Sequence, residues 1–301
     1  MDENQIILID KPANISSFGV VAKVRGHLKS IFGHKVKIGH TGTLDPFATG
    51  LLIILTGKNT KKSSEFLKLD KVYEATLKLG YTSSTGDPEG EIEEYLKEGS
   101  EESVGGYDRD RRSAPPVTTG RRDSVSEEPS LDNLEGKVED YSRQIQYCSV
   151  KDTLATTGVN RTTEPRNDGR KGARPKQNDI ELAINSFIGT IKQTPPRFSA
   201  IKVNGQRAYK LARKGQDFEI PSREVKIYSI DILSFHYPEL KIKVHCSSGT
   251  YIRTLAEDIG QKLGTGAYLT ALRRTRIGDF SIENAKPLED FIEKRATINL
   301  C

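Results

Sequence analysis

Cysteine, methionine and tryptophan are scarce in this chain, whose 301 residues include three cysteines, one methionine and no tryptophan. The cysteines, Cys148, Cys246 and Cys301, lie far apart, and no two of them form a Cys-x-x-Cys pair. Structural zinc sites and redox-active dithiols are commonly built on such pairs. The sequence therefore predicts neither a metal site nor a redox centre, and we expect the protein to work in a reducing compartment.

Long apolar runs are also missing, and none approaches the length of a membrane-spanning helix. The first residues, MDENQIILIDKP, lack the basic and apolar segments of a secretory signal. There is no phosphate-binding Walker pattern, and Gly264-Thr265-Gly266 does not follow a predicted strand, as a dinucleotide-binding loop would. We expect a soluble, cytoplasmic protein that has no membrane partner.

Acidic residues are slightly outnumbered, since 46 Lys and Arg against 41 Asp and Glu give a formal net charge of +5. Such a bias permits a polyanionic partner but does not require one.

Hydrophobic residues make up only 35% of the chain, which indicates that part of it does not pack. In residues 99–178 apolar residues are sparse and no period persists, so we expect a mostly disordered insert there. Residues 1–98 and 179–301 would then form one discontinuous catalytic domain.

Apolar periodicity outside the insert predicts several strands and a few helices. Residues 51–55 (LLIIL) form an uninterrupted apolar run, which indicates a strand buried on both faces. Residues 71–79 and 240–246 alternate between apolar and polar side chains, as half-buried strands do. The strands do not alternate regularly with helices, so the pattern favours an α+β domain around a mostly antiparallel sheet. Further elements are strands at 6–9 and 223–233, a helix capped by Ser16 or Ser17 that buries Val20, Val21, Val24 and Leu28, helices at 59–69, 180–187 and 252–263, and closing segments at 269–276 and 288–292.

A polar loop at residues 39–46 (GHTGTLDP) leads into the buried strand and holds one carboxylate, Asp45, with His40 nearby. Loops held at the end of a core strand often carry reactive side chains, but an aspartate before proline is ordinarily a turn residue. Tyr73 faces the apolar side of its strand, where a core role is the simpler interpretation. Arg253 begins a predicted helix, where the helix dipole disfavours a cation, so either an anionic partner or an exposed position would explain it.

Residues 196–215 (PRFSAIKVNGQRAYKLARKG) interleave Arg and Lys with Phe198 and Tyr209. Basic residues mixed with aromatic ones are typical of surfaces that bind nucleic acid. Within this stretch, Asn204-Gly205 predicts a tight turn.

The loop GHTGTLDP, followed by residues 48–52 (ATGLL), resembles the motif of the TruB family of pseudouridine synthases. Further blocks resemble this family in the same order, and together they cover almost all of the chain outside the insert. They are residues 8–12 (LIDKP) with Ser16-Ser17, residues 71–73 (KVY), residues 196–215, and residues 248–253 (SGTYIR) with residues 272–274 (LRR).

This resemblance implies the pseudouridine-synthase fold, with a central, mostly antiparallel mixed sheet flanked by helices, and conversion of uridine to pseudouridine in the T-loop (position 55) of tRNA. The reaction moves the attachment of the ribose from N1 to C5 of the uracil and adds no atoms, so neither a cofactor nor a metal is needed. Asp45 matches the family's nucleophilic aspartate, and Arg253 matches the arginine that would hold this carboxylate ionised and aimed. Tyr73 matches a tyrosine that stacks on the target base and is a candidate for removing the C5 proton.

The resemblance also assigns contacts with the substrate. Tyr251 and Leu272 would line the pocket, Lys61 would lie near it, and His40 would occupy the space left when the base flips out of its stack. The folded T-arm of the tRNA would be the partner of a monomeric enzyme. Its phosphates would be contacted by the basic residues of the 196–215 stretch, namely Arg197, Lys202, Arg207, Lys210 and Arg213.

Two departures from the family pattern bear on this prediction. The insert replaces a short connection and should lie away from the pocket, and the chain ends too soon after residues 283–298 to hold the C-terminal RNA-binding domain of many members.

The alternatives to a stand-alone tRNA pseudouridine synthase are a relative guided by small RNAs, or a tRNA-binding folding helper without catalysis. The ATGLL sequence favours the stand-alone bacterial type, and a purely binding role would not require Asp45, Tyr73 and Arg253 together.

Overall fold

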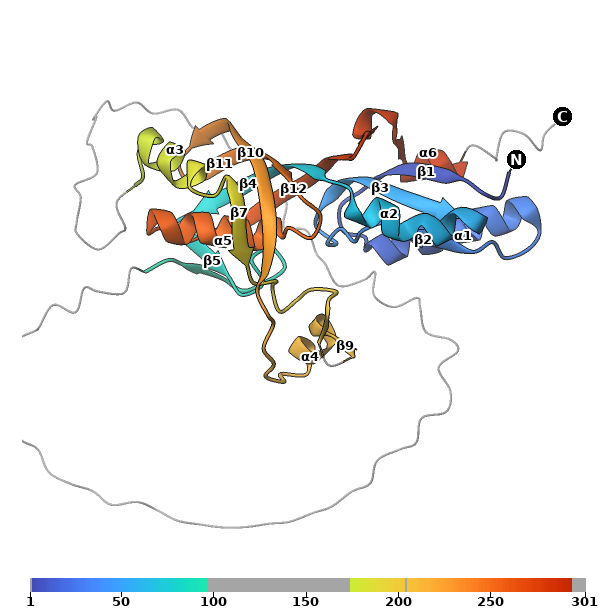
Figure 1. The fold of residues 1–301 in the computed structure, drawn as a ribbon, viewed down its shortest axis with the longest axis horizontal. Helices are drawn as coiled ribbons and strands as arrows, with labels where there is room; N and C mark the ends of the chain where they lie inside the picture. Colours follow the sequence, from blue (N-terminus) through green and yellow to red (C-terminus); the bar gives the residue numbers. More distant parts are fainter. Residues whose placement is uncertain (1, 97–173, 204, 294–301) are drawn as a thin grey trace, which may run out of the picture. The chain divides into compact units, whose positions relative to one another are not determined.

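The computed structural model describes residues 2–96, 174–203 and 205–293 (Figure 1). Residues 99–173 of the predicted insert lie outside the described residues. The remainder of that predicted range, residues 174–178, already contains the start of helix α3 (Gln177–Asn185), so the described domain resumes slightly earlier than predicted. None of the helices in the described ranges is long and apolar enough to span a membrane.

One mixed sheet organises the described residues, with strands in the order β14-β1-β3-β12-β4-β11-β10-β7. Its pairings are antiparallel except those of β1 with β14 and of β3 with β12, which confirms the predicted mostly antiparallel sheet. Two short strands pair at its sides, β2 with β3 and β13 with β12. The strands are β1 (Ile6–Lys11), β2 (Ile38–His40), β3 (Thr49–Thr56), β4 (Lys71–Leu79), β7 (Gly189–Gln193), β10 (Arg223–His236), β11 (Glu239–Cys246), β12 (Ala267–Ile277), β13 (Phe280–Ser281) and β14 (Lys286–Pro287).

Helices pack on the sheet in two groups. Helices α3 and α5 bury their apolar faces on β4, β10, β11 and β12, whereas α1 and α6 pack on β1 and β3. Two hairpins, β5 with β6 and β8 with β9, lie outside the main sheet. The bounds are α1 (Ser17–Phe32), α2 (Ser63–Lys68), α4 (Ala208–Arg213), α5 (Ile252–Leu263), α6 (Leu288–Glu293), 3-10 turns at Gly57–Lys62 and Ile282–Asn284, β5 (Tyr81–Ser83), β6 (Ile92–Glu94), β8 (Lys202–Val203) and β9 (Gln206–Arg207).

Strand β3 is covered on both faces, as its uninterrupted apolar run predicts. Leu52 and Ile54 pack against the group around α1, while the alternate side chains of β3 pack against Phe66 and Ile277. A strand enclosed in this way is held rigidly, and the loop that precedes it inherits that rigidity.

Helix α1 begins where the sequence predicts. The Ser16 hydroxyl accepts a hydrogen bond from the backbone N–H of Gly19 at 3.0 Å, which caps the first turn. Gly33, with φ of +77°, ends the helix in the left-handed conformation that favours glycine. The predicted inner face is buried, and it comprises Val20, Val21, Val24 and Leu28.

The parallel pairing of β3 with β12 brings the 39–46 loop to the middle of the sheet. Gly50 of β3 pairs with Arg274 of β12 and has φ of +104°. A Cβ at Gly50 would lie 2.3 Å from the carbonyl oxygen of Arg274, so only glycine permits this approach. The glycine of the ATGLL sequence therefore has a structural cause.

The basic stretch projects away from the sheet between β7 and β10 (Figure 1). It contains the β8–β9 hairpin followed by α4. Gly205 has φ of +82°, which agrees with the predicted tight turn, while Asn204 lies outside the described residues.

Candidate active site

A cavity of about 260 Å³ lies where the 39–46 loop, β4, β12 and the start of α5 meet. Five residues that were singled out from distant parts of the sequence line this cavity together. They are Asp45, Tyr73, Tyr251, Arg253 and Leu272. The convergence places one carboxylate, one arginine and two aromatic rings around a space large enough for a small organic group.

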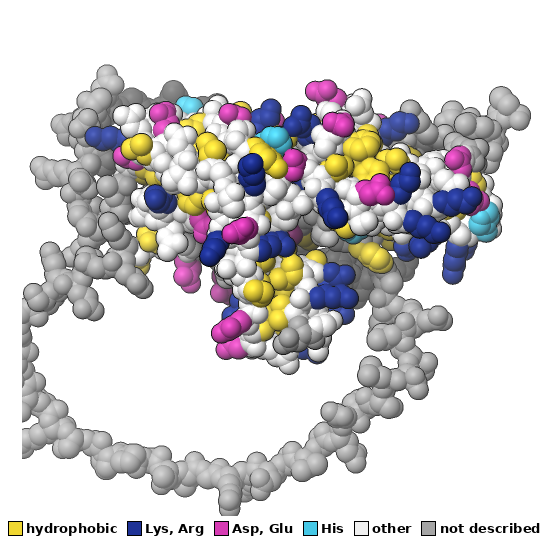
Figure 2. Space-filling model, viewed as in Figure 1, with side chains coloured by type: hydrophobic (Ala, Val, Ile, Leu, Met, Phe, Trp, Pro, Cys, Tyr) yellow, Lys and Arg dark blue, Asp and Glu magenta, His cyan; other side chains and the backbone are white. Residues whose placement is uncertain are grey.

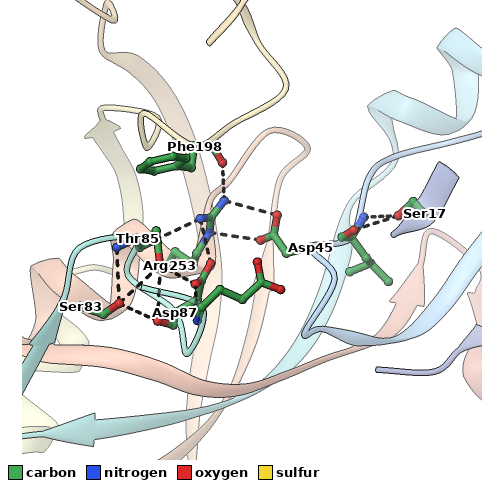
Figure 3. A network of polar contacts seen from close by, with 9 residues as sticks. Ser17, Asp45, Ser83, Thr85, Asp87, Phe198 and Arg253 are labelled. Atoms are coloured by element: carbon green, nitrogen blue, oxygen red, sulfur yellow. Dashed lines mark hydrogen bonds and ion pairs between the residues drawn. The ribbon is translucent and has the colours of Figure 1, made fainter. Parts of the chain in front are cut away.

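Arg253 and Asp45 form the predicted ion pair across the cavity (Figure 3). Arg253 Nε lies 3.1 Å from Asp45 Oδ2, and Arg253 Nη2 donates a hydrogen bond to Asp45 Oδ1 at 3.3 Å. The first contact is an ion pair without hydrogen-bond alignment, since Nε has no hydrogen-bond partner. Arg253 is buried at 4% exposure, whereas the side chain of Asp45 keeps 31% and remains open to a ligand.

Arg253 also binds a second carboxylate, which the sequence did not identify. Its Nη1 donates to Asp87 Oδ2 at 3.0 Å and to the Thr85 carbonyl at 3.0 Å. Its Nη2 also donates to the Phe198 carbonyl at 2.9 Å, so the base of the projecting segment touches the same guanidinium (Figure 3). The guanidinium is thereby fixed from three directions, and its orientation toward Asp45 is set before any substrate arrives.

The turn around Asp87 is shaped to hold that carboxylate. Asp87 Oδ1 accepts hydrogen bonds from the Thr85 hydroxyl at 2.6 Å and from the Glu89 backbone N–H at 3.1 Å. The Ser83 hydroxyl donates to the Asp87 carbonyl at 2.6 Å. In the sequence this segment has the composition of an ordinary turn, and an aspartate in a turn gives no sign that it is buried.

Burial raises the pKa of Asp45, and the nearby Asp87 carboxylate raises it further, while Arg253 lowers it. The resemblance implied that Arg253 keeps this carboxylate ionised. Arg253 acts in that direction, but removal from water outweighs it, so the pKa of Asp45 lies above its ordinary value. Arg253 thus shifts this pKa in the expected direction, and burial is the larger effect.

Two buried groups hold the loop on either side of Asp45. The Ser17 hydroxyl accepts from the Leu44 N–H at 2.8 Å and donates to the Leu44 carbonyl at 2.9 Å. Lys11 Nζ donates to the Pro46 carbonyl at 3.1 Å, and two further carbonyls complete its shell. Both residues belong to motif blocks noted in the sequence, but their contacts could not be seen there.

Arg274 supports the cavity from β12. Its Nε donates to the Leu51 carbonyl at 2.9 Å, and its Nη2 donates to the Gly42 carbonyl at 3.1 Å. Burial raises the pKa of the Tyr73 phenol, and the charge of Arg274 opposes this rise. The Tyr73 hydroxyl is therefore protonated near neutral pH.

Tyr251 is held by residues that the sequence gave no reason to choose. Gln193, at the end of β7, accepts from the Tyr251 backbone N–H at 2.7 Å and donates to its carbonyl at 3.0 Å. The guanidinium of Arg223 lies over the Tyr251 ring at 5.0 Å from its centroid. These contacts fix both the backbone and the ring of Tyr251 immediately before α5.

Two further predicted residues lie apart from the cavity. His40 is half-buried in β2, where burial and the charge of Arg274 lower its pKa, and it does not line the cavity. Lys61 lies in the 3-10 turn after β3 and lines a separate hollow that it shares with Lys35, Lys37 and Lys58.

The predicted basic residues of the projecting segment lie at its surface, and Figure 2 shows Lys and Arg side chains along one edge of it. Arg197 pairs with Asp217 at 2.8 Å, so its charge is partly neutralised. Arg207 donates to the Ala200 carbonyl within the segment. The remaining exposed cations of the predicted set are Lys202, Lys210 and Arg213.

Comparison with protein families gives two matches. Residues 29–107 and 131–252 match the model described as "TruB family pseudouridylate synthase (N terminal domain)", and residues 253–298 match "tRNA pseudouridylate synthase B C-terminal domain". The described part of the second range contains α5, β12, β13, β14 and α6, whose strands belong to the main sheet.

Curated relatives match nearly the whole chain. A protein of Phocaeicola vulgatus named tRNA pseudouridine synthase B is 37% identical over 292 residues, which cover 97% of this chain and 93% of that protein. The protein of the same name from Parabacteroides distasonis is 34% identical over 294 residues, with 96% and 94% covered.

Solved structures share the fold. The "Crystal Structure of a Cbf5-Nop10-Gar1 Complex" contains a chain that matches with a TM-score of 0.55 at 23% identity, covering 97% of this chain and 54% of that one. The "Crystal structure of the archaeal box H/ACA sRNP Nop10-Cbf5 complex" matches with a TM-score of 0.52 at 20% identity, covering 97% and 53%. This chain therefore spans about half the length of those chains, and the likeness confirms the fold predicted from the sequence.

Proposed function

The chain belongs to the TruB family of pseudouridylate synthases, and from this we propose that it isomerises uridine to pseudouridine in tRNA. One observation carries the proposal: a partly open carboxylate, Asp45, faces a cavity and is aimed by a buried arginine. The curated relatives named as tRNA enzymes favour tRNA over a substrate selected by a guide RNA. The T-loop uridine at position 55 is the site that the family assigns.

The reaction requires few groups. The bond between ribose C1′ and uracil N1 breaks, the base turns, C1′ bonds to C5, and the proton lost from C5 is balanced by one gained at N1. A carboxylate either attacks the nucleoside or stabilises positive charge on the sugar, and Asp45 is the carboxylate that lines this cavity. Arg253 would hold Asp45 in the ionised, aimed state that either route needs.

Tyr73 and Leu272, on the paired strands β4 and β12, both line the cavity and would contact the uracil ring. Because the Tyr73 phenol is protonated near neutral pH, it suits stacking on the base. To accept the C5 proton, the Tyr73 phenol would have to be ionised, and the positive charge of Arg274 favours the ionised form by lowering the pKa of Tyr73. The cavity lies inside the protein surface, so the uridine would have to leave its stack to enter.

The projecting segment would grip the T-arm. Its exposed cations suit phosphates of folded RNA, whose shape rather than base sequence would be recognised. Through the Phe198 carbonyl on Arg253, the base of this segment lies within one hydrogen bond of the catalytic pair.

The decisive experiment compares wild type with Asp45→Asn on an unmodified tRNA transcript, followed by mapping of pseudouridine. We expect product at a single T-loop uridine with wild type and none with the variant. Asp231→Asn, which removes an exposed carboxylate from β10, is the matched control and should behave as wild type. Product from Asp45→Asn at the wild-type rate would refute the assigned role.

We further propose that residues 1–98 and 179–301 act as the single catalytic domain of a cytoplasmic monomer. Replacing residues 99–173 with a short Gly/Ser linker should leave turnover intact, and sedimentation should give the mass of one chain. The replacement stops at 173 because the N–H of Lys176 donates to Asp179 Oδ2 at 2.9 Å and helps to begin α3. Loss of activity on replacement would show that the insert takes part in catalysis.

A further inference from the structure

Four cations line the cavity, and Arg223 differs from the other three in its accessibility. Lys71, Arg253 and Arg274 are 6%, 4% and 1% exposed, so a ligand in the cavity reaches little of them. Arg223, the first residue of β10, is only half-buried. Of these four cations, Arg223 is therefore the one that a ligand entering from solvent would contact.

The guanidinium of Arg223 is held in place without a carboxylate. Its Nη2 donates to the Gly249 carbonyl, and its Cζ lies over the Tyr251 ring at 5.0 Å from the centroid. Gly249 has φ of +86°, and a Cβ there would lie 3.3 Å from Arg223 Cζ, so glycine allows the guanidinium to rest against the turn. Arg223 is thus positioned before any ligand binds.

Several donors of Arg223 remain unused. Its Nε is buried and has no hydrogen-bond partner, and within the described residues no ion pair or hydrogen bond involves Nη1. The hydroxyl of Ser199, which also lines the cavity, is buried and has no partner among the described residues. Leaving buried donors unsatisfied is costly, and an anionic oxygen is the group that best satisfies a guanidinium.

We propose that Arg223 binds a backbone phosphate of the RNA beside the flipped uridine; this rests on the proposed function. A nucleotide that enters the cavity brings a phosphate on each side, and the Asp45 carboxylate repels them. Arg253 cannot offset this repulsion fully, because two carboxylates already share its charge. Lys71 and Arg274 are also positive but buried, so Arg223 is the accessible cation that offsets this repulsion, and it thereby orients the ribose relative to Asp45.

The first test uses wild-type protein and a T-arm stem-loop RNA in which a neutral methylphosphonate replaces the phosphate on one or the other side of the target uridine. One of the two replacements should weaken binding about tenfold, as expected for the loss of a charge-assisted contact. Arg223→Gln should bind the natural RNA about tenfold more weakly and should lose no further affinity with that methylphosphonate. Unchanged wild-type affinity for both modified RNAs would overturn the proposal, whether or not the variant folds.

The second test measures how affinity for the natural RNA depends on salt. Arg223→Gln should reduce the slope of log affinity against log salt by about 0.7, the value for one phosphate contact on a single strand. Arg223→Lys keeps the charge and should keep the slope, whereas a purely structural role in supporting Tyr251 would leave the slope unchanged in Arg223→Gln as well. Lys226→Gln, which removes an exposed cation from the same strand, is the control and should leave the affinity and the salt slope near those of wild type.

The two proposals fail in different ways. If wild type forms no pseudouridine in the natural stem-loop or tRNA, the proposed function fails. If wild type forms pseudouridine but Arg223→Gln keeps wild-type affinity and salt slope, only the role of Arg223 fails.

Discussion

Arg253 Nη1 donates a hydrogen bond to Asp87 Oδ2 at 3.0 Å, and Asp87 is buried at 2% exposure. The guanidinium therefore joins a structural carboxylate on one side to the open carboxylate of Asp45 on the other. Without Asp87, the ion pair of Arg253 with the half-open Asp45 would remain, but its ion pair with a fully buried carboxylate would be lost. Asp87 thus fixes the arginine, and the arginine in turn fixes Asp45.

The first prediction is that Asp87→Ala lowers both stability and turnover. Removing one partner of a buried ion pair costs about 3 kcal/mol, which urea unfolding would measure. Because Arg253 would lose its anchor, kcat should fall more than the affinity for RNA. Asp87→Asn, which can still accept the Arg253 hydrogen bond, should be milder in both respects.

Glu91→Gln is the control for this prediction, since Glu91 is an exposed carboxylate in the same connection. It should leave both stability and kcat near wild type. Equal effects of Asp87→Ala and Glu91→Gln would show that Asp87 has no special role.

The second prediction concerns the pH dependence of activity. The pKa of Asp45 is raised by burial and by Asp87, so activity that needs its ionised form should fall off at a higher pH than an ordinary aspartate would give. In Asp87→Asn one of the causes is removed, and the acidic limb of the kcat profile should move to lower pH. An unchanged limb would contradict the assignment of that limb to Asp45.

The third prediction follows from the same shift but concerns stability. The unfolded chain has the ordinary aspartate pKa of 3.8, and in the folded protein the pKa of Asp45 is higher. At pH values between these two pKa values, Asp45 is protonated more often in the folded protein than in the unfolded chain. Over this window Asp45 therefore contributes less stability as pH rises. Asp45→Asn, which resembles the protonated form, should be at least as stable as wild type at pH 7, with the advantage shrinking toward pH 4. A melting temperature for Asp45→Asn well below wild type at pH 7 would contradict this sign.

Much of the fold followed from patterns that are local in the sequence. The apolar run of β3, the alternation in β4 and the capping serine of α1 each have one structural solution, and each prediction is confirmed. The loop that holds Asp45 could be singled out because it precedes a buried strand, but the local pattern favoured a turn residue, and the catalytic role of Asp45 came from the resemblance. Its partner Arg253 was found through the resemblance rather than through the pattern.

The rest of the site depends on contacts between residues far apart in the chain. Asp87 and Arg253 are 166 positions apart, and an aspartate in a polar turn has the same local pattern whether it is buried or not. Arg274 occupies a strand position where a basic residue normally indicates an exposed face, yet its guanidinium is buried on backbone carbonyls. Composition and periodicity carry no information about such partners, so the sequence could not reveal them.

The fourth prediction compares Ser17→Ala with Ser16→Ala. Ser17→Ala removes both hydrogen bonds that hold Leu44, leaves a buried N–H unsatisfied and should cost about 1–3 kcal/mol. Because Leu44 precedes Asp45, kcat should also fall. Ser16→Ala removes only the cap of α1, so it should cost about 1 kcal/mol and leave kcat unchanged. Unfolding curves and single-turnover rates separate the two variants, and equal kcat values would refute the role given to Ser17.

The fifth prediction concerns the close pairing of β3 with β12 at Gly50. In Gly50→Ala the new Cβ would meet the backbone of Arg274 at 2.3 Å, and φ of +104° adds strain, so the variant should lose about 3 kcal/mol or more. Gly26→Ala is the matched control, because nothing lies within 4 Å of its Cβ and it sits inside α1. That change should raise stability by about 0.5–1 kcal/mol, since alanine favours the helix. Urea unfolding measures both, and a Gly50→Ala variant as stable as wild type would contradict the close approach of β3 to the backbone of Arg274.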